Sequence, residues 1–328
     1  LMAATHGRSF WMIDDLTPLH QLSDEVTKSD FYLYKPDMAY RMHQSGGWQE
    51  PDTKLVGENH PNGAIINFYL KDLKEGDKVN LDILEMDGTI IRSYANTASA
   101  DKMNPASTQK LEVAKGGNRM VWNMRYPGFE EFKGMIFYSS PNVGPKAVPG
   151  HYKVRLTYNG NSMEQTLSIE KDPRITNTQD DFQQQFDFLM AVRDQVTRAN
   201  KAVINIRDIK KDLSYLKEKT TDNAEIQKLV DAFESELSTI ENNIHMTKNQ
   251  SSQDPLNFGI RINNRLAFLL ADSQRGDQRP TKQAQDFFGE VTKELDAQIN
   301  ALNTLVQKQA TAINEKVEEN HIKMISME

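Results

Sequence analysis

The chain divides into two halves by the spacing of its apolar residues. Before Pro173, apolar and polar residues alternate over short segments, which is the period-two pattern of half-buried strands. After Thr178, apolar residues recur every three or four positions, which is the pattern of amphipathic helices. The change of period predicts a β-rich first half and an α-helical second half.

The strongest local signal is a hairpin around Asn159-Gly160. Both residues tolerate the positive φ that a type I′ turn requires, and alternating segments flank them. Pro173 ends the return strand because it has no N–H to donate to a ladder. The apolar positions of the two predicted strands are Tyr152, Val154, Leu156, Tyr158, Met163, Leu167 and Ile169.

Short alternating segments fill residues 62–172 at even spacing. We count about seven predicted strands, including one at 135–138. This number of strands, separated by turns, favours an Ig-like antiparallel β-sandwich. Trp122 lies in one of the alternating segments, so we expect it in the core.

Residues 173–328 predict four helices joined by short turns. Thr178 begins the first, Asp222 and Glu225 have the spacing of an N-terminal cap for the second, Asp254-Pro255 begins the third, and Pro280 opens the fourth. Short turns between amphipathic helices place neighbours antiparallel, so we expect an up-down helical bundle.

The first 18 residues contain the apolar run Phe10 to Ile13, which is typical of a strand buried on both faces. Trp11 is therefore also expected in a core. A single strand cannot be stable alone, because its ladder groups need partners. We expect residues 1–17 to pair with the sandwich or with a neighbouring copy, or else to be poorly ordered. The chain begins inside this predicted strand, so we also expect sequence upstream of it.

Composition and charge exclude several function classes. The net charge is −7 with both signs mixed, so no basic field indicates nucleic-acid binding. The absence of cysteine excludes thiol catalysis, disulfides and cysteine-ligated zinc. No apolar run approaches the roughly 20 residues of a membrane span.

Candidate chemistry is sparse, and we predict no catalytic residue, no metal ligand and no cofactor. Asp14-Asp15 and Glu130-Glu131 are adjacent carboxylates, but neighbouring strand residues point to opposite faces and cannot act as a glycosidase pair. No two histidines have metal-ligand spacing on a helix. Trp48 lies in a glycine-containing loop, and it is the one weak candidate for a binding contact.

Several segments resemble a known family. Residues 5–18 look like the last blade strand of the bacterial sortilin-like, Asp-box (neuraminidase-repeat) β-propeller proteins, which are often labelled glycosyl hydrolases. The later similar segments are residues 31–36, 39–41, 57–64, 118–127, 256–257, 263–267 and 279–281. The similarity covers the part of that family after the propeller, and no Asp-box occurs in this sequence.

The resemblance implies an organisation and a set of functions. It implies a propeller remnant at 1–18, a connector at 19–61, the Ig-like sandwich at 62–172 and the four-helix bundle at 173–328. We favour a non-catalytic scaffold region of a periplasmic or extracellular bacterial protein. Its expected partner is an upstream propeller or another protein, with a glycan as the alternative. Two alternatives stay open. The chain can be part of a glycoside hydrolase whose catalytic groups lie on the propeller, or it can be an oligomerising adhesin-like module.

Overall fold

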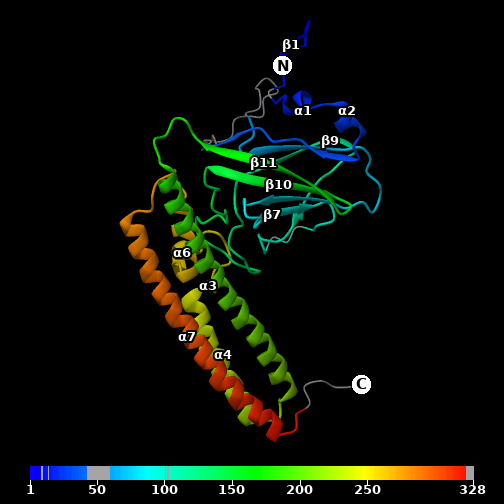
Figure 1. The fold of residues 1–328 in the computed structure, drawn as a ribbon. Helices are drawn as coiled ribbons and strands as arrows, with labels where there is room; N and C mark the ends of the chain where they lie inside the picture. The colour runs from blue at the N-terminus through cyan, green and yellow to red at the C-terminus, as the bar shows by residue number, and fades with distance from the viewer. Residues whose placement is uncertain (9, 14, 43–59, 100, 102, 323–328) are drawn as a thin grey trace. The chain divides into compact units, whose positions relative to one another are not determined.

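The computed structural model describes residues 1–8, 10–13, 15–42, 60–99, 101 and 103–322. Strands occupy the first half and helices the second, so the predicted α+β class is confirmed (Figure 1). The chain forms two compact units, each described by itself. The first unit comprises Leu1–Pro127, Gly144–Phe186 and Gly276–Gln278, and the second comprises Gly128–Val143, Asp187–Arg275 and Arg279–Glu328.

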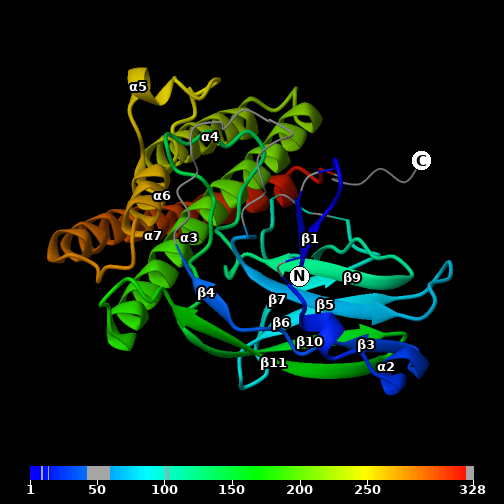
Figure 2. The ribbon, with the colours of Figure 1, turned by 90° about the horizontal axis from the view of Figure 1, so that it is seen from above.

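A six-stranded sheet forms one layer of the first unit (Figure 2). Its order is β4 (Ala39–Arg41), β11 (Asn161–Lys171), β10 (Gly150–Tyr158), β6 (Val79–Leu84), β7 (Ile90–Ala95) and β8 (Gln109–Lys110). β10 is antiparallel to both neighbours, and β11 returns from it through Asn159 (φ 47°) and Gly160 (φ 89°). Both φ values are positive, as a type I′ turn requires, so the predicted hairpin is confirmed.

A three-stranded sheet lies against the first one. β5 (Ala64–Leu70) is its central strand, antiparallel to β3 (Phe31–Leu33) and β9 (Gly116–Trp122). The Trp122 ring meets the Tyr152 ring of β10 edge-on, with centroids 5.8 Å apart. Trp122 is fully buried, which confirms its predicted place in the core. Each large side chain buried in this way contributes about 1.5–3 kcal/mol.

The segment predicted as a connector contributes a strand to each sheet, through β3 and β4. Two short helices precede them, α1 (Thr17–His20) and α2 (Asp24–Lys28). The division into four parts at residues 18, 61 and 172 therefore stays a prediction, since the two compact units group the residues differently.

The second unit is helical. It contains α3 (Gln179–Lys219) from residue 187 onward, α4 (Ala224–Ile244), α6 (Ile262–Ser273) and α7 (Lys282–Glu319). One apolar cluster joins these helices to Phe129 and Phe132 of the segment 128–143. Among the residues that the structure describes, no helix has both the length and the apolar character needed to cross a bilayer.

Two sequence expectations about regular elements are wrong. Residues 135–138 form no strand, because the Asn264 side chain replaces a strand partner there. Its Oδ1 accepts from the Tyr138 N–H at 2.8 Å and its Nδ2 donates to the Tyr138 carbonyl at 3.2 Å. The third helix begins at Pro255 as predicted, but Gly259 (φ 75°) breaks it into α5 (Pro255–Phe258) and α6.

The cap of α4 is Asn223 and not the predicted Asp222. Asn223 Oδ1 accepts from the Ile226 N–H at 3.1 Å, which satisfies one of the free N–H groups of the first turn. We expect Asn223→Ala to lower the free energy of unfolding by about 1 kcal/mol. The measurement is urea unfolding followed by far-ultraviolet circular dichroism. Asp222→Ala is the control, expected within about 0.5 kcal/mol of the unchanged chain; an equal loss in both variants would contradict the assignment.

Candidate functional site

The one predicted binding residue, Trp48, lies outside the described residues. The adjacent glutamates have structural partners in the second unit. Glu130 pairs with Lys201 at 3.2 Å, and Glu131 Oε1 accepts from Asn142 at 2.8 Å. That Glu130 and Glu131 form no glycosidase pair stays a prediction.

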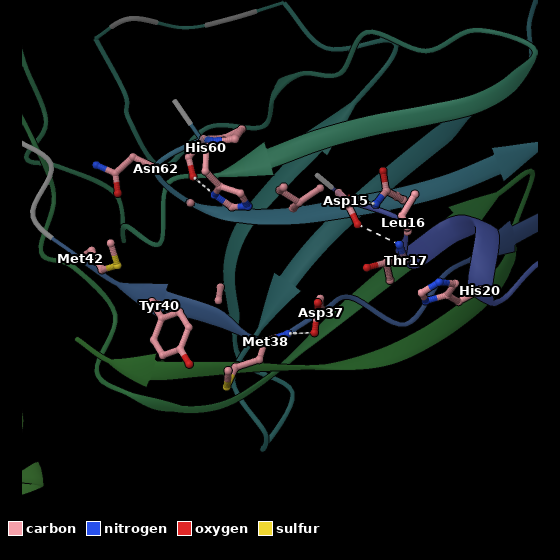
Figure 3. A pocket seen from close by; sticks show the side chains of 15 residues that line it. Asp15, Leu16, Thr17, His20, Asp37, Met38, Tyr40, Met42, His60 and Asn62 are labelled. Atoms are coloured by element: carbon pink, nitrogen blue, oxygen red, sulfur yellow. Dashed lines mark hydrogen bonds between the residues drawn. The ribbon is translucent and has the colours of Figure 1, made fainter. Parts of the chain in front are cut away.

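A cleft in the first unit brings together three separate stretches of the chain, and we name it the β4–β5 cleft. It lies between residues 15–20 around α1, residues 37–42 around β4, and residues 60–67 at the start of β5. Its volume is about 550 Å³. Figure 3 shows the labelled side chains arranged around this opening, with Asp15 and His60 on one side and Asp37 and Tyr40 on the other.

Asp15 forms part of the wall of the cleft. Its Oδ1 accepts from the Thr17 N–H at 3.0 Å, and its Oδ2 accepts from Asn67 Nδ2, also at 3.0 Å. Burial would raise the pKa of Asp15, but the hydrogen bonds from Thr17 and Asn67 and the charge of Arg119 outweigh it and hold the pKa below its usual value. Asp15 is therefore ionised at neutral pH and is not suited to donate a proton in catalysis.

The opposite wall is formed by Asp37 and Tyr40. Both side chains are exposed, and Asp37 Oδ1 accepts from the Met38 N–H at 2.8 Å, which orients the carboxylate. Tyr40 is 43% exposed and is carried by β4, whose parallel pairing with β11 fixes its position. His60 also lines the cleft, with its Nδ1 3.0 Å from the Pro61 carbonyl oxygen.

The lining of the cleft mixes polar and apolar side chains and carries no lysine or arginine among its described residues. Nowhere in the described part of the chain do three histidine, aspartate or glutamate side chains gather as a metal would require. The arrangement provides carboxylate acceptors, amides, imidazoles and an aromatic ring. Polar groups of these kinds, set among apolar side chains, are the ones that orient a bound molecule in a small-ligand cleft.

A buried ionic cluster lies beside the cleft in the same unit. Arg41 of β4 donates to Asp277 Oδ1 at 2.9 Å and to the Ala147 carbonyl at 2.8 Å. Lys146 Nζ donates to the Met42 carbonyl at 2.7 Å, and burial together with the charges of Arg125 and Arg41 lowers the pKa of Lys146 to about 8. These contacts fix the end of β4 that carries Tyr40, so we assign the cluster a structural role.

The first residues form a two-stranded hairpin, which we name the N-terminal hairpin. β1 (Met2–Ala4) pairs antiparallel with β2 (Phe10–Met12), so the apolar run pairs within the first residues and not with the sandwich. Pairing with a neighbouring copy stays a prediction. The prediction that Trp11 is buried is also wrong, since its side chain is 63% exposed. A hairpin of two strands cannot cover both of its own faces. Its exposed apolar residues are Leu1, Met2, Phe10, Trp11, Met12 and Ile13.

Comparisons with known proteins assign no family. No protein-family model matches the chain, and no curated protein matches it. Among solved structures, a protein named pT26-6p aligns with 73% of this chain and 47% of its own length, at 10% identity and a TM-score of 0.15. A score this low supports no argument about fold or function.

Proposed function

We propose that this chain is a non-catalytic scaffold region of a secreted bacterial β-propeller protein, periplasmic or extracellular, that docks onto the propeller through its N-terminal hairpin. The observation that carries the proposal is the exposed apolar surface of the hairpin, including Trp11 and Phe10. The similarity of residues 5–18 to a last blade strand supports the same partner.

The finer fold belongs to this proposal. The two facing sheets, whose rings meet at Trp122 and Tyr152, fit an Ig-like antiparallel sandwich. The long helices α3, α4 and α7 with their common apolar cluster fit an antiparallel up-down bundle. Both are architectures that can serve as scaffolds.

The physics of the hairpin favours a β-sheet partner. A two-stranded hairpin is only marginally stable in water, and apolar side chains on both faces gain about 25 cal/mol for each Å² removed from water. Each strand also presents one edge for further pairing. A propeller blade supplies both needs, since it can pair with an edge and cover the apolar faces.

Trp11→Asp tests this proposal. We expect the variant to bind a separately produced propeller domain at least about tenfold more weakly, because a charge replaces a buried aromatic anchor. We expect its unfolding to be unchanged within about 0.5 kcal/mol, since Trp11 is exposed in the free chain. The measurement is isothermal titration of the propeller into this chain.

Leu256→Asp is the matched control, because Leu256 is 62% exposed but lies on α5 in the second unit. It should bind the propeller like the unchanged chain. Equal binding by Trp11→Asp, or no binding by the unchanged chain, would contradict the docking proposal. Turnover of a glycoside or peptide substrate that disappears on mutating one residue of this chain would contradict its non-catalytic part.

A further inference from the structure

We propose that the β4–β5 cleft is a binding site for a neutral saccharide. The inference is independent of the N-terminal hairpin, because no residue of β1 or β2 lines the cleft. It is carried by the size of the cleft, the mixture of hydrogen-bonding groups around it and the sign of its charge.

The size fits a small ligand. About 550 Å³ lies within the range of roughly 300–1,000 Å³ that is typical of small-molecule sites. The walls also contain apolar side chains, among them Met38 and Ile65, beside the polar ones. The cleft therefore offers the combination of apolar contact and a few directed polar groups that such sites use.

The polar groups of the cleft are better matched to a ligand with several hydroxyl groups than to a ligand with a single charge. Asp37 is an acceptor, the Asn62 amide both donates and accepts, and the imidazole of His20 can do either. A sugar presents hydroxyls, which donate and accept in the same way, around a ring with an apolar face. The half-exposed ring of Tyr40, labelled in Figure 3 among the side chains that line the cleft, can pack against that face.

The charge of the cleft selects against anions. Asp15 and Asp37 contribute two carboxylates, and the described lining contains neither lysine nor arginine. Asp37 is exposed, and a phosphate or carboxylate ligand would meet its negative charge on that wall. Asp15 already accepts hydrogen bonds from Thr17 and Asn67 and lies in the field of Arg119. Asp37 is therefore the exposed acceptor of the cleft, and a hydroxyl group can donate to it.

The walls are held in place by neighbouring backbone. Gly63 approaches β9 so closely that a Cβ built there would lie 2.4 Å from the Trp122 carbonyl oxygen. On the other side, Ala39 and Tyr40 pair with Ile169 and Glu170 of β11. A preorganised site loses less free energy on binding, because fewer groups need to be ordered.

The test is isothermal titration with named probes against the whole chain. The neutral probes are cellobiose, maltose, lactose and chitobiose, the anionic probe is sialyllactose, and the cationic probe is glucosamine. We expect at least one neutral probe to bind at millimolar concentration or below. Asp37→Ala and Tyr40→Ala should each weaken that binding by about tenfold, which corresponds to about 1.4 kcal/mol.

Two control variants match the test variants in chemistry and exposure. Tyr215→Ala removes a tyrosine that is 42% exposed on α3, and Asp222→Ala removes an exposed aspartate before α4. Both should bind the neutral probe like the unchanged chain. The proposal is overturned if no neutral probe binds, if sialyllactose or glucosamine binds more tightly than every neutral probe, or if the test and control variants behave alike.

Discussion

The free energy of unfolding of the first unit is expected to fall by about 3–5 kcal/mol when Arg41 is replaced by methionine. Arg41 is 3% exposed and holds Asp277 through two hydrogen bonds, from Nε at 3.1 Å and from Nη2 at 2.9 Å. Methionine fills similar space but leaves the Asp277 carboxylate buried without its guanidinium. The Ala147 carbonyl and Gln185 Oε1 lose a donor as well.

Urea unfolding followed by tryptophan fluorescence measures this effect. All three tryptophans, Trp11, Trp48 and Trp122, belong to the first 127 residues, so the signal reports on the first unit. Arg155→Met is the matched control, because Arg155 pairs with Glu164 at 2.7 Å in a largely solvated pair. We expect that control to lose at most about 1 kcal/mol.

A second variant separates the buried charge from lost packing. Adding Asp277→Leu to Arg41→Met removes the buried carboxylate that has lost its guanidinium, so the double variant should be more stable than Arg41→Met alone. Two outcomes would show that the pair of Arg41 and Asp277 does not hold β4 in place. One is a loss of less than about 1 kcal/mol in Arg41→Met, and the other is a double variant that is less stable than Arg41→Met.

Local rules predicted those parts of the fold that local geometry decides. The Asn159-Gly160 turn is one, since two residues with positive φ leave few alternatives. The helices after Thr178 are another. Apolar residues that recur every three or four positions along segments as long as α3 and α7 are compatible with an α-helix and not with a strand. Breaks within a period are harder to predict. Gly259 adopts a positive φ and so ends α5, but the spacing of apolar residues in the sequence continues across it and gives no sign of the break.

Trp11 and Trp122 show why burial could not be predicted from pattern alone. Both occur in short apolar segments, and both were expected in a core. Trp122 meets Tyr152 from the facing sheet, whereas β2 pairs only with β1 and leaves Trp11 exposed. An apolar pattern indicates that a residue favours a covered surface, but it does not indicate whether the same chain provides the cover.

The β4–β5 cleft could not be found from sequence motifs. Asp15, Asp37, Tyr40 and His60 come from three stretches whose spacing matches no site pattern. They converge because β4 joins the edge of one sheet while β5 is central in the other. Strand pairing between residues more than 100 positions apart, such as Ala39 with Ile169, decides that convergence.

Acidification is expected to destabilise the second unit through His245. His245 is 3% exposed at the end of α4, where the Phe132 ring meets it edge-on at 4.9 Å and Asn263 Nδ2 lies 3.3 Å from its Nδ1. Burial and the charge of Arg207 lower the pKa of His245 to about 4, with Asn263 and Glu241 acting in the opposite direction. The charged groups facing this region are Arg207 and Lys210 of α3 and Glu241 of α4.

The sign of the pH dependence follows from this lowered pKa. In the unfolded chain a histidine titrates near 6.5, so below that pH the unfolded state binds a proton that the folded state resists. The contribution of His245 is complete above pH 6.5 and is lost as the pH falls toward 4. The difference between the pKa of histidine in the unfolded chain and that of His245 in the folded chain corresponds to about 3 kcal/mol of stability. About 2 kcal/mol of the free energy of unfolding is lost between pH 7 and pH 5.

His245→Asn tests this expectation, since asparagine keeps a polar group near Asn263 but does not titrate. Urea unfolding at pH 7 and pH 5, followed by far-ultraviolet circular dichroism, should show a smaller loss on acidification in this variant, by about 2 kcal/mol. His321→Asn is the control, because His321 is exposed in the same unit and asparagine tolerates its positive φ of 50°. The control should keep the full pH dependence. If His245→Asn keeps the full pH dependence as well, the buried imidazole is not the acid-sensitive group. The loss of stability on acidification must then come from carboxylates, and Glu241, which pairs with Arg207 and Lys210, is the first of them to replace.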